Sequence, residues 1–426
     1  MRAMSVTSPT HRAIDAVWRI ESARVIAGLA RMLRDLDLAE ELAQDALVAA
    51  LETWPRDGVP DNPGAWLMTT AKRRAIDRLR RLQLLDRKHE ELARELEDIQ
   101  DERRSRDEDA LDHDIDDDLL RLVFVSCHPV LSMDARVALT LRLLCGLTTD
   151  EIARAFLAAE PTVAQRIVRA KRTLAEADVA FEVPRGDALQ KRLASVLGVV
   201  YLVFNEGYAA TSGDDWVRPA LCEEALRLGR MLAALTPAEP EVHGLVALME
   251  IQASRLHARV GKDGEAVLLL DQDRSRWDQL LIRRGLEALA RAERLGGAFG
   301  PYALQAAIAA CHARARTADE TDWSRIAALY AALARVNPSP VVELNRAVAV
   351  SMASGAESAL PLVDRLQDDP TMKHYHLLPS VRGDLLSRLG RHDEARAEFE
   401  RAAAMTRNAR EQALLLARAR ECARAG

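Results

Sequence analysis

The sequence predicts an all-α protein with several domains. Three observations lead to this prediction: aromatic residues make up 4% of a chain that is 49% hydrophobic, good helix formers such as Ala and Leu are abundant, and apolar side chains recur at helical spacing. A chain of 426 residues also exceeds what a single compact core usually holds. We therefore expect roughly two to four helical domains.

The composition argues against a metal site, a cofactor or a membrane segment. The five cysteines are far apart and form no CxxC pair, so neither a zinc site nor a disulfide framework is predicted. No stretch approaches the roughly 18 consecutive apolar residues of a membrane span, and the N-terminus lacks the apolar core of a signal peptide. The sequence has no phosphate-binding glycine loop and no GxSxG elbow. We expect a cytoplasmic protein that is not an enzyme.

The first 85 residues are predicted to form two helices, a loop and a third helix. Apolar residues recur at helical spacing from Ala13 to Glu52, with an interruption at Asp35–Asp37 that indicates a tight corner. The stretch Trp54–Gly64 is dense in Pro, Gly, Asp and Asn, which predicts a loop. Asn62 can then cap a helix that runs to about Leu85.

The charges are unevenly distributed along the chain. The net charge is −6, yet six basic residues stand between Lys72 and Arg81 against one acid, Asp77. The stretch Glu95–Asp118 contains thirteen acids and three arginines. Phosphate groups respond to local charge, so the net charge does not exclude a nucleic-acid partner.

A second domain is predicted to begin beyond a charged linker. Residues 86–115 are charged and poor in large apolar groups, which is typical of an acidic linker or a solvated helix. Short amphipathic helices are predicted at Leu119–Leu131 and Met133–Leu144, the second starting near Ser132 or Met133.

The segment from Gly146 to Arg172 predicts two helices joined by a short turn. Thr149 or Asp150 is expected to cap the first helix, and Pro161 suits the first turn of the second. The residues expected to bury the helix crossing are Ile152, Ala153, Phe156, Val163 and Ile167. The second helix then exposes side chains that can donate hydrogen bonds to base edges and phosphates, namely Thr162, Gln165, Arg166, Arg169 and Arg172. By itself, the segment fits a helical hairpin with a basic solvated face equally well.

These segments, in this order, resemble the extracytoplasmic-function sigma factors of bacterial RNA polymerase. The run Asp37–Leu47 (DLAEELAQDAL) is similar to the family's core-polymerase-binding region. Asn62–Leu67 (NPGAWL) and Ala75–Arg81 (AIDRLRR) resemble the helix that melts and reads the minus-ten promoter element. Similarity to the domain that reads the minus-thirty-five element lies in Leu141–Leu144, Glu151–Ala153 and Thr162–Val163. The likeness covers about residues 10 to 178.

The resemblance implies three groups of site residues and no catalytic group. Carboxylates would bind core polymerase: Asp37, Glu40, Glu41 and Asp45. The minus-ten element would be contacted by Asn62, Lys72, Arg73, Arg74, Arg78, Arg80 and Arg81. The minus-thirty-five element would be contacted by Thr162, Gln165, Arg166, Arg169, Lys171 and Arg172. Promoter opening requires phosphate contacts and surfaces for unstacked bases, which agrees with these residue types. Trp66 is expected to be a core residue rather than a base-stacking platform.

This chain departs from the family's usual pattern at two points of the helix-turn-helix. It has Leu157 where the family usually places a Gly in the turn, and Ala164-Gln165 where the family often has a Lys-Ser pair.

The second half of the sequence predicts stacked helical hairpins. One unit has the spacings of a tetratricopeptide repeat, with Arg391–Glu394 as its turn and with Gly383, Gly390, Ala395, Phe399 and Ala402 at its small and apolar positions. An earlier copy includes Ala347, Ala359 and Val363, and a weaker one ends at Tyr330 and Asn337-Pro338. This arrangement resembles the subgroup of these sigma factors with a long tetratricopeptide-like C-terminal extension, which implies that the extension controls activity.

The segment Tyr201–Tyr208 has two interpretations. Its polar residues Asn205, Glu206 and Tyr208 would form a ligand or docking site, or Gly207 would cap the end of an apolar helix. We prefer the helix cap.

The leading hypothesis divides the chain into five segments. They are residues 1–85 (sigma region 2), 86–115 (acidic linker), 116–182 (sigma region 4 with the helix-turn-helix), 183–290 (helical extension) and 291–426 (tetratricopeptide-like repeats). The protein would bind core RNA polymerase and promoter DNA, and its extension would control activity and bind an unidentified protein or ligand. A tetratricopeptide-type scaffold is one alternative. A conventional helix-turn-helix regulator is the other, but it leaves Asp37–Leu47 and Lys72–Arg81 unexplained.

Overall fold

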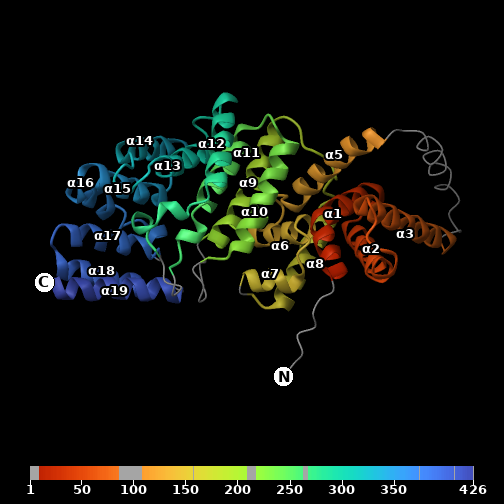
Figure 1. The fold of residues 1–426 in the computed structure, drawn as a ribbon, viewed down its shortest axis with the longest axis horizontal. Helices are drawn as coiled ribbons and strands as arrows, with labels where there is room; N and C mark the ends of the chain where they lie inside the picture. Colours follow the sequence, from red (N-terminus) through yellow and green to blue (C-terminus); the bar gives the residue numbers. More distant parts are fainter. Residues whose placement is uncertain are drawn as a thin grey trace, which may run out of the picture. The chain divides into compact units, whose positions relative to one another are not determined.

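The computed structural model describes residues 9–85, 108–156, 158–208, 217–261, 267–373, 375–406 and 408–425, with the backbone alone for Pro9, 81–85 and 108–116. Over these residues the secondary structure is helical, with no strand, which confirms the all-α prediction. The chain divides into two compact units, Met1–Val199 and Val200–Gly426, which are described separately (Figure 1). No helix in the described ranges is long and apolar enough to cross a membrane.

The first unit begins with three helices that pack on one another. Helix α1 (Pro9–Leu33) turns into α2 (Leu36–Asp57) at a tight corner, where the Asp35 carboxylate accepts a hydrogen bond from the Leu38 N–H at 3.0 Å. This corner was predicted. Helix α3 (Pro63–Leu85) is capped by the Asn62 side chain, which accepts from the Ala65 N–H at 3.0 Å, also as predicted.

The loop before α3 is shorter than predicted, because α2 continues through Trp54 and Pro55 to Asp57. Trp54 is buried and packs edge-on against Trp66, with 5.4 Å between ring centroids, so the last turn of α2 stays docked on the core. The helix stops only at Gly58, whose φ of 87° favours glycine and whose N–H donates to the Trp54 carbonyl. Trp66, half-buried, occupies the core-facing position expected of it.

Helices α5 (Glu108–Ser126) and α6 (Met133–Leu144) come next in the first unit. Helix α5 begins earlier than the predicted Leu119 and ends five residues before the predicted Leu131, because Pro129 cannot continue a helix. The Ser132 side chain caps α6 and accepts from the Ala135 N–H, in agreement with the prediction.

The predicted helix-turn-helix is confirmed as α7 (Thr149–Ala155) and α8 (Glu160–Glu176). The cap of α7 is Thr148 rather than Thr149 or Asp150. Its hydroxyl accepts from the Glu151 N–H while the Glu151 carboxylate accepts from the Thr148 N–H at 2.8 Å, a reciprocal capping box. Leu157, in the turn, lies outside the described residues.

Helix α9 (Asp187–Tyr208) runs past Gly207, so that glycine does not cap the helix as we preferred. Instead it allows a close approach: a Cβ at Gly207 would lie 2.7 Å from the backbone nitrogen of Cys222 in α10 (Pro219–Leu235). Glu206, one of the polar residues of the alternative interpretation, forms an ion pair with Arg218 at the start of α10.

The second unit continues as a series of helices in which each packs on the next (Figure 1). The α-helices are α11 (Pro240–Ala253), α12 (Gln279–Arg294), α13 (Pro301–Arg314), α14 (Trp323–Val336), α15 (Pro340–Ser354), α16 (Ala356–Asp364), α17 (Leu377–Arg388), α18 (His392–Met405) and α19 (Ala409–Ala425). Four 3-10 turns accompany them: Leu256–Ala258, Leu269–Asp271, Arg274–Arg276 and Pro370–Met372. Stacked helical hairpins of this kind are the architecture of tetratricopeptide-like repeats.

The α17–α18 hairpin has the small-residue packing that the repeat spacing predicted. A Cβ at Gly383 would lie 3.0 Å from the Phe399 ring, and Ala395, Phe399 and Ala402 are buried. The turn, however, is centred on Gly390, with a φ of 74°, because α18 already begins at His392. The predicted turn residues Asp393 and Glu394 therefore belong to the first turn of α18, where acidic groups are favoured.

All five cysteines, from Cys127 to Cys422, are buried thiols. Burial raises the pKa of Cys127 to about 11 and that of Cys222 to about 12.

Candidate nucleic-acid interface

Helix α3 buries one stripe of residues and exposes several of its basic residues. Leu67, Ala71 and Ala75 are buried at intervals of four residues, so the positions midway between them, such as Thr69 and Arg73, face outward. Three predicted minus-ten residues are exposed: Arg73, Arg78 and Arg80. Arg73 and Arg80 lie on the face opposite the buried stripe, with the exposed Asp77 between them, whereas Arg78 continues the stripe beyond Ala75. Phosphate groups can reach all three arginines.

The remaining predicted minus-ten residues have other placements. Arg74 is partly exposed and lies 3.5 Å from Asp45 of α2, while Lys72 is half-buried and engaged in an interaction. Asn62 is exposed but uses its side-chain oxygen as the α3 cap. The side chain of Arg81 lies outside the described residues.

Helix α8 buries Val163, Ile167, Ala170 and Leu174, a stripe of three- and four-residue steps that fixes its orientation. The opposite face exposes Thr162, Gln165 and Arg169 of the predicted minus-thirty-five group, together with Arg172, which pairs with Glu176 in the next turn at 3.3 Å. Gln and Arg on an exposed helix face are the residue types that read base edges in a major groove.

Arg166 lies on the edge of this face and pairs with Asp134 of α6 at 3.2 Å. The two residues border a cleft of about 420 Å³ between α6 and α8, whose lining also includes Thr162, Gln165 and Ser132. Asp134 was not among the predicted site residues. Its carboxylate lies where it would repel a phosphate group, so it reduces the positive charge of this end of α8.

Lys171 is not on the exposed face of α8. Its side chain is 9% exposed, and its Nζ lies 2.6 Å from Glu40 Oε2 and 2.7 Å from Asp37 Oδ1, both on α2. The reason is its position: Lys171 follows Ala170 and precedes Leu174, so it borders the buried stripe.

Glu40, one of the predicted polymerase-binding carboxylates, is buried between two cations. Besides Lys171, Arg142 of α6 donates from Nε to Glu40 Oε1 at 2.5 Å. Burial acts to raise the pKa of Glu40, but the charges of Lys171 and Arg142 outweigh it, and the pKa lies below its ordinary value. Burial likewise opposes the raised pKa of Lys171, which Glu40 and Asp37 impose. Both groups are therefore held in their charged forms.

The other predicted polymerase-binding residues differ in exposure. Asp37 and Glu41 are exposed, and Asp45 is partly exposed beside Arg74. Only Glu41 and Asp45 therefore form a carboxylate surface that does not contact α8.

Arg142 is a functional candidate that sequence reasoning passed over. It occurs in α6, where seven of the eight residues from Val137 to Leu144 are buried. A cation in such a helix requires an acidic partner, since an unpaired buried charge is costly. The apolar run around Arg142 was thus the signal that a carboxylate from elsewhere in the chain approaches it.

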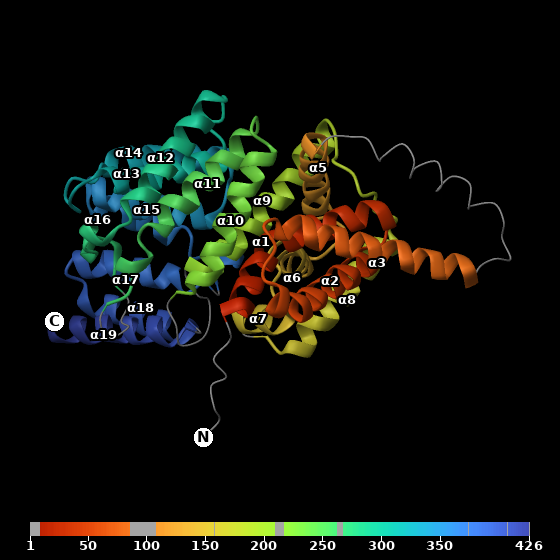
Figure 2. The ribbon, with the colours of Figure 1, turned by 45° about the vertical axis from the view of Figure 1, so that its right-hand side comes forward.

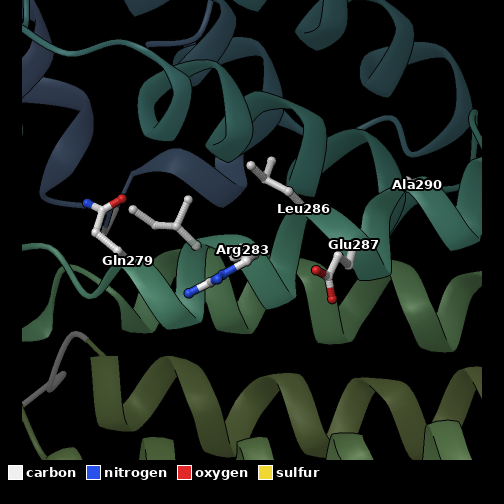
Figure 3. A pocket seen from close by; sticks show the side chains of 6 residues that line it. Gln279, Arg283, Leu286, Glu287 and Ala290 are labelled. Carbon is white, nitrogen blue, oxygen red and sulfur yellow. The ribbon is translucent and has the colours of Figure 1, made fainter.

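In the second unit, a groove of about 530 Å³ follows one face of α12 (Figure 3). Its lining residues all belong to that helix: Gln279, Ile282, Arg283, Leu286, Glu287 and Ala290. No group of three or more His, Cys, Asp or Glu side chains that could hold a metal ion occurs in the part of the chain that the structure describes. The unidentified ligand of the extension stays a prediction.

Comparison with known families finds two sigma-70 regions within the first unit. Residues 19–84, which span most of α1 to α3, match sigma-70 region 2, and residues 121–174, which contain α6, α7 and all but the last two residues of α8, match sigma-70 region 4. The chain belongs to the extracytoplasmic-function sigma factors. This sigma factor carries a long C-terminal extension, of which residues 192–293 match a family of unknown function. An uncharacterized protein of Rhizobium meliloti (strain 1021) is 45% identical over 393 residues, covering 92% of each chain.

Proposed function

We propose that this sigma factor binds core RNA polymerase through the carboxylates of α2, contacts the minus-ten element with α3 and the minus-thirty-five element with α8, and is controlled by its C-terminal extension. The observation that carries the proposal is the presence of exposed basic residues on two helices, α3 in the sigma-70 region 2 match and α8 in the region 4 match. A scaffold protein would not need either set.

The exposure of the α2 carboxylates determines how polymerase binding is best tested. A charge reversal at Glu40, such as Glu40→Lys, would place a third cation beside Lys171 and Arg142 and disturb the fold. Glu41 and Asp45 are therefore the residues to substitute. The full-length chain is mixed with purified bacterial core polymerase, and complex formation is followed by gel filtration. We expect a stoichiometric complex with the wild type and a loss of at least tenfold in affinity for Glu41→Lys/Asp45→Lys, about 1.4 kcal/mol or more.

A matched control reverses Glu52 and Asp57, two exposed carboxylates near the end of α2 that lie outside the predicted surface. This double variant has the same change in net charge, so it separates a specific contact from general electrostatic repulsion. Absence of any complex with the wild-type chain would contradict the polymerase assignment and favour the scaffold alternative.

Control by the extension is tested by in vitro transcription with a chain that ends at Glu182, after α8 and before α9. Lost transcription would mean that the extension is required, and increased transcription would mean that it inhibits. Equal transcription from the truncated and full-length chains, at equal polymerase occupancy, would contradict the proposed control.

A further inference from the structure

Three arginines and two aromatic rings are in contact with one another in the second unit. Arg255 lies over both the Tyr208 ring and the Trp277 ring, with 5.7 Å from its Cζ to each ring centroid. Arg259 lies over the Tyr208 ring at 3.9 Å, and Arg274 lies over the Trp277 ring at 4.9 Å. The contacts thus run in the order Arg259, Tyr208, Arg255, Trp277 and Arg274, and we call these five residues the arginine ladder.

The ladder is built from the ends of two helices and from two 3-10 turns. Tyr208 is the last residue of α9, and Arg255 follows α11, which packs on both α12 and α13 (Figure 2). Arg259 follows the turn Leu256–Ala258, and the turn Arg274–Arg276 supplies the last arginine. These two turns contact each other. Segments that are separate in the sequence therefore bring the three cations together.

Arg274 is held by carbonyl groups, whereas Arg255 retains a donor without an acceptor. Arg274 Nη1 donates to the His312 and Ala315 carbonyls at the end of α13, at 2.6 and 2.7 Å. Arg255 and Trp277 are only 9% and 3% exposed, yet Arg255 Nε and Trp277 Nε1 have no acceptor among the residues that the structure describes. Buried donors in proteins almost always have a partner. Two donors that lie in contact with each other's side chains thus point to an acceptor from outside the described chain.

No carboxylate of the described residues forms an ion pair with Arg255 or Arg274. The acids closest to the ladder in sequence are Glu206, two residues before Tyr208, and Glu250, five residues before Arg255. Each of them pairs with an arginine outside the ladder, at the start of α10 and within α10. Cation–π contacts offset only part of the cost of burying a guanidinium group. The ladder is therefore a concentration of positive charge that an anion would stabilise.

The other titratable groups beside Arg255 are uncharged at neutral pH. Burial, together with the charges of Arg255 and Arg274, lowers the pKa of His312 to about 3. Burial and the neighbouring Tyr201 raise the pKa of Tyr330 to about 12, although the charge of Arg255 acts in the opposite direction. Neutral imidazole and phenol groups can form hydrogen bonds with an anion, but they cannot neutralise the arginines.

We propose that the arginine ladder binds the phosphate group of a small molecule. A phosphate monoester carries a charge of about −1.5 to −2 at pH 7 and three acceptor oxygens, which suits several cations better than a single carboxylate does. The guanidinium fork also matches phosphate geometry. Arg255 and Trp277 are buried too deeply for a phosphate that is fixed in a nucleic-acid backbone. Access is from the end of the ladder where Tyr208 and Arg259 are half-buried.

The inference concerns binding alone, so it stands whether or not the extension controls transcription. Binding to the full-length chain is measured by isothermal titration calorimetry with inorganic phosphate, glycerol 3-phosphate and acetate, as sodium salts at equal ionic strength. We expect both phosphate probes to bind and acetate to bind on the order of tenfold more weakly, or less. Tighter binding of glycerol 3-phosphate would identify a phosphate ester as the ligand, and tighter binding of inorganic phosphate would identify the free ion. Either result supports the proposal.

Variants separate the ladder from the exposed basic residues of α3 and α8, which also attract phosphate. Arg255→Gln and Arg259→Gln each remove one cation of the ladder, and we expect each to weaken phosphate binding on the order of tenfold or more. Arg259 is half-buried at the end of the ladder, so Arg259→Gln tests the site even if Arg255→Gln does not fold. The control is Arg283→Gln, which makes the same charge change at an exposed position of α12 and should leave the affinity unchanged.

Hydrogen exchange locates the bound phosphate independently of affinity. Phosphate should increase the protection of Ser254–Arg259 and Asp273–Trp277 in the wild type and should not do so in Arg259→Gln. Absence of phosphate binding to the folded wild type would overturn the proposal. So would equal affinities of the wild type and both ladder variants, or acetate binding as tight as phosphate binding.

Discussion

The α2–α8 contact in the first unit and the α17–α18 contact in the second join helices in opposite ways. The first brings together charged groups from distant parts of the sequence: Glu40 and Lys171. The second brings together small and aromatic residues sixteen positions apart, Gly383 and Phe399, with ion pairs such as Arg382–Glu398 beside them. The apolar contact is set by local packing, whereas the polar contact depends on the charges of groups that come from distant parts of the chain.

The largest effect is expected in the apolar contact. Phe399→Ala removes a buried ring from between α17 and α18, and loss of such a side chain costs about 3–5 kcal/mol of unfolding free energy. This loss is measured by chemical denaturation of the full chain, with hydrogen exchange as the probe of unfolding in the second unit. The control is Leu389→Ala, because Leu389 is 37% exposed and should cost less than about 1 kcal/mol. An equal loss of unfolding free energy in both variants would contradict the view that the buried Phe399 ring holds α17 and α18 together.

A smaller effect is expected in the ion cluster of Asp37, Glu40, Arg142 and Lys171. Glu40→Gln keeps the shape of the side chain but removes the charge that Lys171 and Arg142 share, and hydrogen bonds to charged groups contribute about 1.5–3 kcal/mol each. Because Asp37 still holds Lys171, we expect a total loss of about 2–3 kcal/mol in the first unit. Glu41→Gln, at the exposed neighbouring position, should stay within about 0.5 kcal/mol of the wild type. Hydrogen exchange at α2 and α8 would reveal the difference, and protection equal to the wild type in both variants would refute it.

The smallest effect concerns pH. The groups that face Glu40 are Lys171, Arg142, Asp37 and the Gln44 amide, and the two cations hold the pKa of Glu40 below its ordinary value of 4.5. The folded-state pKa is thus lower than the unfolded one, so this ion cluster contributes its full stability above pH 4.5 and loses it as pH falls through the lower folded value.

Chemical denaturation of the full chain at a series of pH values measures this directly. We expect a constant unfolding free energy of the first unit from pH 7 to about pH 5 and a lower one below pH 4.5. In Glu40→Gln the low-pH transition should disappear or weaken strongly. A transition of equal size in that variant would assign the titration to a different carboxylate.

Most helices of the fold follow from the sequence because their signals are local. The Asp35 and Asn62 caps and the apolar stripe of α8 each depend on residues within a few positions, and the structure contains all of them. The end of α2 depends instead on the packing of Trp54 against Trp66, and Gly207 on the approach of α10. No local pattern distinguishes the last turn of α2 from a loop, or Gly207 from a helix cap.

The placement of the candidate site residues could likewise be predicted only where it depends on local sequence. The exposure of Gln165 and Arg169 follows from helical periodicity alone. The burial of Lys171 does not, because its partners lie 131 and 134 positions earlier in the chain. The partner of Arg142 could be predicted only in part. An arginine within an apolar run requires an acidic partner, but the run does not identify Glu40 as that partner.

The burial of the cysteines has a consequence for how this protein would respond to oxidants. A thiol reacts with peroxide and with disulfides in its thiolate form. Burial raises the pKa of Cys127 to about 11 and that of Cys222 to about 12. Almost none of either thiol is therefore ionised at neutral pH. Cys127 and Cys222 are therefore poor redox sensors while the chain stays folded. In the folded chain, oxidation of these two sulfur atoms would first require the helices that bury them to open.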